Sequence, residues 1–257
     1  HSREYAVRRY GNSKLLCDRL LRHDLYNTMN ISEIERKLFE MQDVRYRDFS
    51  SSLMPDVDKD RVIGVRTPEL RLLAKNLARE CPDVVLGMSL PEKYFEEDNL
   101  RGFVIAELKD YDRVVAELDK FLPFVDNWAT CDMLRPKLFR NRRYSERLES
   151  DACRWLSDSR PFVCRFGIGM LMTHFLDDGF CESHLHLVGS VDNPHYYVRM
   201  MVAWYFATAL AKQYAYAIRY IEANKLPVWT HNKSIQKAVE SRRVSLEHKA
   251  YLRTLRR

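Results

Sequence analysis

Apolar residues recur at intervals of three and four along most of the chain, which is the periodicity of amphipathic helices. The segment after Thr67 and Pro68 shows the pattern most clearly, because residues 70–77 place an apolar stripe on one helix face. Apolar and polar residues almost never alternate as they do in a half-buried strand. The sequence therefore predicts an all-α protein.

Capping signals and breakers divide this pattern into separate helices. Ser32 and Glu35 match a capping box before the first helix, and Thr67 followed by Pro68 matches an N-cap and a first helical position. Prolines and turns rich in Asp, Asn and Gly separate the later helices. We expect those helices at residues 91–108, 111–122, 126–139, 145–157, 161–176, 181–189, 195–211, 214–223 and 231–254.

Two of the predicted helices begin alike. Residues 161–165 (PFVCR) and 194–199 (PHYYVR) each start with proline and place an arginine about one turn later. This similarity favours a degenerate two-helix repeat, and HEAT or armadillo units of about 40–47 residues fit best. Such units stack into a solenoid with a concave groove. We expect one domain over residues 1–257, with 1–30 as an N-terminal helical extension and 229–257 as a basic C-terminal helix.

Composition excludes several classes of protein. With 46% hydrophobic and 30% charged residues, the 257-residue chain is typical of a globular protein, and it has no apolar run long enough to span a membrane. The start at His1 has no apolar signal segment behind it, and the six cysteines form no CxxC pair, so we expect reduced thiols in a cytoplasmic protein. The eight glycines form no GxGxxG or P-loop motif, so a nucleotide cofactor is not expected.

Positive charge is concentrated in two places. Residues 229–257 contain eight Lys and Arg against two Glu, which leaves the rest of the chain near neutral. A second basic run follows Asp132 and comprises Arg135, Lys137, Arg140, Arg142, Arg143 and Arg147. Such runs are often solvated helix faces. Two of them near a candidate site favour a polyanionic partner.

That candidate site consists of four residues. Trp128 and Asp132 are four residues apart and share a helix face, while Arg165 follows Trp128 by 37 residues and Trp204 follows Arg165 by 39. These steps are close to one two-helix repeat, so the four side chains are expected to converge. Individually, the tryptophans also fit a core, the aspartate a helix cap and the arginine a structural bond to a neighbouring repeat.

The sequence DNWATCD at residues 126–132, with GVRTPELR at 64–71, VCR at 163–165 and VAW at 202–204, resembles the bacterial alkylpurine DNA glycosylases built from HEAT-like repeats, the AlkD type. The resemblance extends in order from about residue 31 to about residue 240. It implies release of N3-alkyladenine and N7-alkylguanine from duplex DNA without base flipping. Where the family often has a second tryptophan, this chain has Asn127.

The resemblance also assigns roles to the four residues. Asp132 would stabilise positive charge on the sugar and orient water, because an already cationic purine needs no protonation to leave. Trp128 and Trp204 would offer their π-faces to the cationic sugar and base, and Arg165 would bind the flanking phosphate. No metal or organic cofactor is implied, and the partner would be duplex DNA with alkylated purines bound by a monomer.

Further DNA contacts are expected from Arg199, Lys233 and Lys237, together with the basic run. The stretch 49–63 looks like a long linker, and Tyr46 and Phe49 are candidates for an aromatic contact to the duplex. Cys181, His184 and His186 lack zinc spacing and are not expected to bind metal.

Two other functions fit the same sequence: a non-catalytic HEAT-like module for damaged or branched DNA, and a scaffold that binds an acidic protein. A pure DNA binder would gain nothing from the Asp132 carboxylate near phosphates. In a protein scaffold, Trp128 and Trp204 would simply be core residues.

Overall fold

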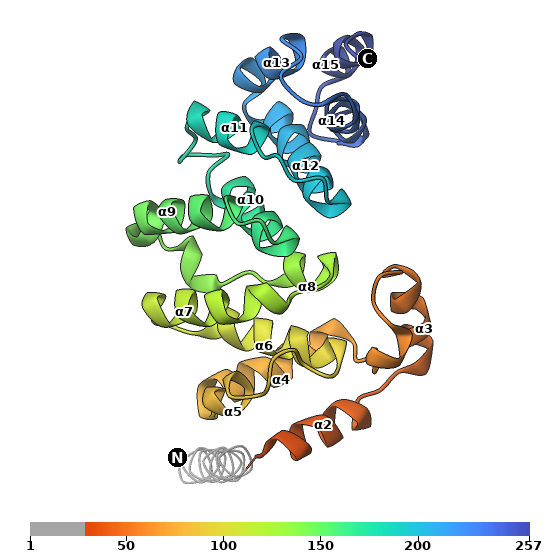
Figure 1. Ribbon diagram of the computed structural model, residues 1–257, viewed down its shortest axis with the longest axis vertical. Coiled ribbons are helices and arrows are strands. Elements are labelled where there is room, and N and C mark those ends of the chain that lie inside the picture. The colour runs from red at the N-terminus through yellow and green to blue at the C-terminus, as the bar shows by residue number, and fades with distance from the viewer. Residues whose placement is uncertain (1–28) are drawn as a thin grey trace, which may run out of the picture. The chain divides into compact units, whose positions relative to one another are not determined.

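The structure, a computed structural model, describes residues 29–257, and this part of the chain contains helices and no strand (Figure 1). The all-α prediction is therefore confirmed. Nearly all of the predicted N-terminal extension lies outside the described residues. By its contacts the chain divides into two compact units. Unit 1 contains the described residues up to Phe121 and Met133–Leu138, and unit 2 contains Leu122–Asp132 and Phe139–Arg257. The single-domain organisation stays a prediction.

Unit 1 is built around helices α2, α4 and α6. Its elements are α2 (Ile31–Glu40), α3 (Val44–Ser52), η1 (Lys59–Arg61), α4 (Thr67–Glu80), α5 (Pro82–Leu86), α6 (Phe95–Glu107) and α7 (Tyr111–Phe121). The stripe predicted on α4, Leu70, Leu73, Ala74 and Leu77, is buried in one hydrophobic cluster with residues of α2 and α6. Burial of this stripe holds α4 against the rest of the unit.

The N-cap of α2 differs from the predicted one. Asn30 Oδ1 accepts a hydrogen bond from the N–H of Glu33 at 3.0 Å, and the Glu33 carboxylate accepts from the N–H of Asn30 at 2.7 Å. The capping box thus begins two residues before Ser32. Asparagine caps as well as serine does, and Ile34 and Leu38 of the helix that it begins are buried in the core.

The predicted linker 49–63 is partly helical, because it contains the end of α3 and all of η1. Asp43 caps α3 by accepting from the N–H of Tyr46 at 3.0 Å. No residue of α3 is buried, so its sequence carries no helical periodicity that could have predicted it.

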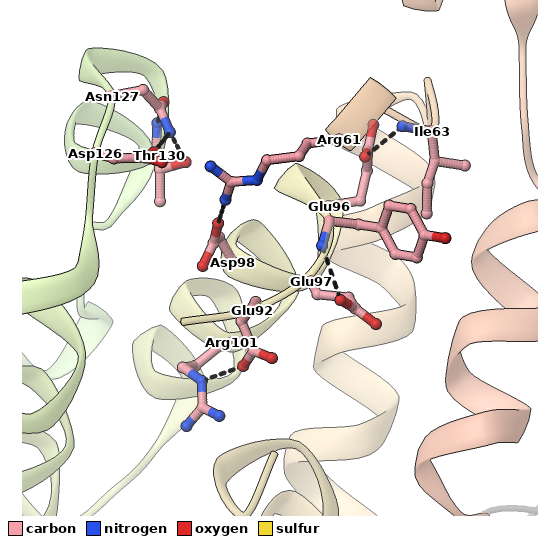
Figure 2. A network of polar contacts seen from close by, with 11 residues as sticks. Arg61, Ile63, Glu92, Glu96, Glu97, Asp98, Arg101, Asp126, Asn127 and Thr130 are labelled. Atoms are coloured by element: carbon pink, nitrogen blue, oxygen red, sulfur yellow. Dashed lines mark hydrogen bonds and ion pairs between the residues drawn. The ribbon is translucent and has the colours of Figure 1, made fainter. Parts of the chain in front are cut away.

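Nearly all of α6 is buried, including four charged residues, and each of the four has protein partners (Figure 2). Glu96 accepts from the main-chain N–H groups of residues 63–65 at 2.7–3.2 Å. Gly64 lies in this loop at φ 96°, and a Cβ there would lie 2.5 Å from Cβ of Arg47. Glycine is therefore needed where the chain enters α4.

The other three buried charged residues of α6 bind segments that lie next to this helix. Arg101 donates to Glu92 at 2.6 Å and to the main-chain oxygens of Leu86 and Met88. Asp98 accepts from Arg61 at 3.1 Å, and Glu97 accepts from the N–H of Tyr94 at 2.9 Å. Because a buried charge without a partner is strongly destabilising, these contacts fix the position of α6 beside α4 and α5.

Unit 2 is a series of helices that pack in chain order. Its elements are η2 (Leu122–Phe124), α8 (Trp128–Met133, whose last residue belongs to unit 1), η4 (Arg142–Tyr144), α9 (Ser145–Leu156), α10 (Pro161–His174), α11 (Glu182–Gly189), α12 (Tyr196–Lys212), α13 (Tyr214–Glu222), α14 (Val228–Glu240) and α15 (Leu246–Thr254). Helix α10 packs on α9 and α12, and α12 packs on α13 and α14 (Figure 1).

The main helices of unit 2 recur at a regular interval. Pro161, Pro194 and Pro227 stand at or just before the starts of α10, α12 and α14, and each step is 33 residues. The interval is shorter than the predicted units of about 40–47 residues. Gly167 allows α10 to approach α9, since a Cβ there would lie 2.3 Å from the nitrogen of Leu156.

Two predicted helices are shorter than expected. The helix predicted at 126–139 ends at Met133 and is followed by η3 (Lys137–Arg140), because Pro136 has no N–H for a continuing helix. The predicted basic helix 229–257 consists of α14 and α15, with Ser245 capping α15 by accepting from the N–H of His248 at 3.1 Å. Within residues 29–257 we find no helix with the length and apolar character needed to cross a membrane.

Candidate functional site

Helix α8, which carries Trp128 and Asp132, is fixed at its start by Asn127. The buried Asn127 side chain accepts from the N–H of Thr130 at 2.8 Å, and its Nδ2 contacts Thr130 Oγ1 at 3.1 Å and Asp126 Oδ1 at 2.9 Å (Figure 2). Asn127 is therefore the N-cap of a very short helix. The Asn-x-x-Thr spacing is the sequence signal that could have identified it.

The carboxylate of Asp132 forms a two-point ion pair with Arg165 of α10. Arg165 Nε donates to Oδ1 at 2.9 Å and Nη2 donates to Oδ2 at 2.7 Å. The third nitrogen, Nη1, donates to the main-chain oxygen of Tyr197 on α12 at 2.6 Å. The structure thus brings Asp132 and Arg165 into direct contact and links α8, α10 and α12 through one guanidinium.

The two partners of this ion pair differ in how deeply they are buried. The Arg165 side chain is 6% exposed and that of Asp132 is 16% exposed, so the Asp132 side chain is the more accessible of the two. Bidentate guanidinium–carboxylate pairs hold a fixed plane. Burial also raises the pKa of the neighbouring Cys164 thiol to about 12. The result is a carboxylate held in a set orientation by a buried guanidinium.

The two tryptophans lie on the same helices as Asp132 and Tyr197. Trp128 is half-buried and lies one turn before Asp132 on α8. Trp204 is 39% exposed and lies two turns after Tyr197 on α12, roughly 10 Å further along the helix axis. Within residues 29–257 we find no hydrogen bond, ion pair or ring stacking from either indole to Asp132 or Arg165. Trp204 lines a separate hollow of 220 Å³ with Lys237 and Arg243.

An aromatic row leads away from Arg165 along the starts of α10, α12 and α14. It consists of Phe162, Tyr197, Tyr196 and Trp229, with ring centroids 5.9, 5.2 and 5.9 Å apart in that order. The Arg165 guanidinium lies 6.0 Å from the ring of Tyr197. Tyr196 is 54% exposed, so the row reaches the surface of unit 2.

Two predicted DNA-binding cations meet at the end of this row. The guanidinium of Arg199 lies 4.3 Å from the ring centroid of Trp229, and the ammonium of Lys233 lies 5.8 Å from it. Sequence reasoning missed Trp229, although Trp229 and Lys233 are four residues apart on one helix face. The indole holds both cations near one point by cation–π attraction.

The residues of the predicted basic run contact different parts of the protein. Lys137 is paired with Glu107 at 2.5 Å, and Arg135 donates to the main-chain oxygen of Leu134 at 3.3 Å. Arg142 is paired with Asp178, and Arg143 lies over the ring of Tyr144, 4.4 Å from its centroid. Arg140 is exposed.

The remaining candidate residues include Tyr46, Phe49, Cys181 and His184, and the structure gives the contacts or the exposure of each. Tyr46 Oη lies 3.4 Å from Thr67 Oγ1, and Phe49 is 61% exposed on α3. His184 is buried and its Nε2 lies 2.7 Å from Glu149 Oε1, while Cys181 contacts Ser183. Among the described residues no group of three or more His, Cys, Asp or Glu side chains could hold a metal ion.

A comparison with known protein families gives a match. Residues 34–238 match the model of the family described as DNA alkylation repair enzyme, which is most of the chain. The protein therefore belongs to the DNA alkylation repair enzyme family, and the resemblance noted in the sequence is confirmed at the level of the family. Membership implies an enzyme that binds DNA. No curated protein was found to match the chain.

Proposed function

We propose that this protein is a monomeric DNA glycosylase that removes cationic N3- and N7-alkylated purines from duplex DNA. The observation that carries the proposal is the partly exposed Asp132 side chain, whose carboxylate Arg165 holds in a fixed plane. We further propose that the 33-residue helix pairs of unit 2 are HEAT-like repeats that present this carboxylate to the duplex in a concave groove.

The chemistry needs little more than such a carboxylate. An N3- or N7-alkylated purine carries positive charge, so the electrons of the C1′–N bond move to the base, which leaves neutral without being protonated. The sugar becomes oxocarbenium-like, and a water oxygen then bonds to C1′ and loses a proton. A preoriented carboxylate stabilises this cation without needing to reorganise, and Asp132 is proposed for that role and for orienting the water.

Arg165 has two roles in this proposal. Three of its five N–H donors are used by Asp132 and Tyr197, so its main role is to position the carboxylate. The remaining two donors are available for the phosphate expected beside the lesion. Trp128 and Trp204 would flank the sugar and the base, and their attraction for a cation grows as charge develops on the sugar. In this arrangement the base need not leave the stack.

The alternative is a protein that binds DNA without cutting it. The aromatic row with Arg199 and Lys233 favours DNA binding in either case, since exposed rings and paired cations suit nucleic acid. In a DNA binder Asp132 would serve only as the counter-charge of Arg165, whereas in a glycosylase it would also stabilise the cationic sugar. Asp132 therefore discriminates between the two functions.

The test compares Asp132→Asn with the wild type on methylated duplex DNA. We expect release of methylated purines to fall by at least about 100-fold, as for loss of other preorganised electrostatic groups, while duplex affinity stays within about threefold. Asn keeps one oxygen that can accept from Arg165 but removes the counter-charge, so circular dichroism is used to confirm that the variant is folded before release is compared. Asp177→Asn is the matched control, since it removes an aspartate from an exposed ion pair with Lys212 in the same unit.

Each outcome of this test is decisive. Equal release by Asp132→Asn and wild type would contradict the role of the carboxylate. Duplex binding by the wild type with no release of any methylated purine would support the non-catalytic alternative.

A further inference from the structure

Unit 1 contains a basic hollow that the proposed active site does not use. The hollow has a volume of 290 Å³ and lies between α4, α6 and the segment at residues 133–138. Its charged lining residues are Arg71, Lys75, Arg135, Lys137 and Glu107. Four cations thus surround one carboxylate, and this carboxylate is already paired with Lys137 at 2.5 Å.

Arg71 is held at the wall of this hollow by an aromatic ring. Its guanidinium carbon lies 3.9 Å from the ring centroid of Phe103, and Nη2 lies 3.4 Å from the main-chain oxygen of Met133. Arg71 is exposed to solvent. Burial of part of its guanidinium lowers its pKa, and the nearby Glu107 carboxylate raises it. No carboxylate within the described part of the chain forms a salt bridge with it. A solvent-accessible cation that is held in position by a ring is complementary to an anion.

Lys75 extends the same surface. It follows Arg71 by four residues, so both side chains leave α4 on one face. Lys75 also lines a neighbouring hollow of 540 Å³ that includes Arg79 and Arg113. Within residues 29–257 Lys75 forms no salt bridge, and Leu72, 62% exposed, lies beside it in the same rim. An apolar rim next to free cations suits a phosphate that carries a sugar.

We propose that this hollow binds a phosphate group, with Arg71 and Lys75 as its main ligands and Phe103 as the support that orients Arg71. A guanidinium offers two parallel N–H donors to phosphate oxygens, and an ammonium adds a point charge. The phosphate has two possible sources, the backbone of duplex DNA and a free phosphate ester. The site goes beyond the proposed glycosylase function, which needs only residues of unit 2.

The experiment uses the double variant Arg71→Gln, Lys75→Gln. Affinity for an unmodified duplex is measured over a salt series from 50 to 200 mM, and binding of inorganic phosphate is measured separately by calorimetry. We expect the salt slope to fall by about one, as for the loss of one phosphate contact, and phosphate binding to be lost. The charge-keeping variant Arg71→Lys, Lys75→Arg should restore most of the slope.

A matched control is Arg36→Gln, Lys93→Gln. It removes the same charge from two exposed cations of unit 1 that lie outside the hollow and pair with Glu40 and Glu35. Lys75→Gln alone, at an exposed helical position, keeps the test decisive if the double variant fails to fold.

The outcomes separate the sources and the hypotheses. A lower slope in the double variant but not in the control identifies DNA as the source of the phosphate. Loss of phosphate binding with an unchanged slope supports the site and identifies a free phosphate ester. If neither quantity differs from the control, the proposal is overturned. Purine release is scored independently, so a failed glycosylase function would leave these results readable.

Discussion

At the scale of single residues, burial gives two thiols of unit 2 different expected reactivities. Cys164 precedes Arg165, is buried, and has its pKa raised to about 12 by that burial. Cys181 is exposed on the surface, 2.9 Å from the hydroxyl of Ser183. Because the thiolate is the reactive form, burial should keep Cys164 unreactive in the neutral range.

We therefore predict that iodoacetamide labels the exposed Cys181 in the folded protein, while Cys164 stays unlabelled between pH 7 and pH 9. The raised pKa keeps the Cys164 thiol protonated across this range, so its contribution to stability is lost only as the pH rises toward about 12. Mass spectrometry of the labelled peptides measures both sites, and unfolding in urea serves as the positive control for Cys164. Comparable labelling of the two thiols in the folded protein would show that Cys164 is accessible.

The residue scale also shows what spacing can and cannot predict. Asp132 and Arg165 could be selected from the sequence, because repeated helices place them in register. Their two-point contact could not, since it depends on α8 ending at Met133 and on Arg165 reaching Tyr197 of α12. The sequence therefore predicted that these side chains converge, but not which of their atoms form hydrogen bonds.

At the scale of elements, helix ends were harder to predict than helix faces. The apolar stripe of α4 was predicted correctly because burial selects it directly. Helix α3 was missed because it buries nothing, and α14 and α15 were merged because charged residues continue across Ser241–Ser245. Local polar contacts set these ends, and several side chains in one segment can compete for the same cap.

The cap of α2 gives a direct test of this competition. We predict that Asn30→Ala lowers the free energy of unfolding by about 1 kcal/mol, because it removes the acceptor for the N–H of Glu33. Ser32→Ala should change it by less than about 0.5 kcal/mol, since Ser32 lies exposed within the helix. Urea unfolding monitored by circular dichroism measures both. The reverse order of effects would restore Ser32 as the cap.

At the scale of the whole molecule, the sequence shows how much positive charge the protein carries, but it does not show which cations are already paired with carboxylates. The basic run after Asp132 was expected to act together, yet Lys137 and Arg142 are engaged with Glu107 and Asp178. Arg140 and Arg143 have no carboxylate partner among the described residues. These two are therefore the members of the run best suited to a polyanion.

We predict that Arg140→Gln combined with Arg143→Gln lowers the salt slope of duplex binding by about two, with similar loss of affinity for all sequences. Fluorescence anisotropy over a salt series measures the slope. The control is Arg154→Gln with Arg160→Gln, since both arginines are exposed in the same unit but are paired with Asp151 and Asp158. An unchanged slope in the first variant would mean that the run is solvated surface.

The ion pair between Asp132 and Arg165 also restricts how this protein can diverge. Replacing Asp132 by an apolar residue would leave a guanidinium that is 6% exposed without its counter-charge, which typically costs about 3–5 kcal/mol. Replacing both residues by apolar ones avoids that penalty. Descendants that abandon the chemistry are therefore expected to change the two positions together, so a relative that retains one charge without the other would mark a recent or unfinished loss.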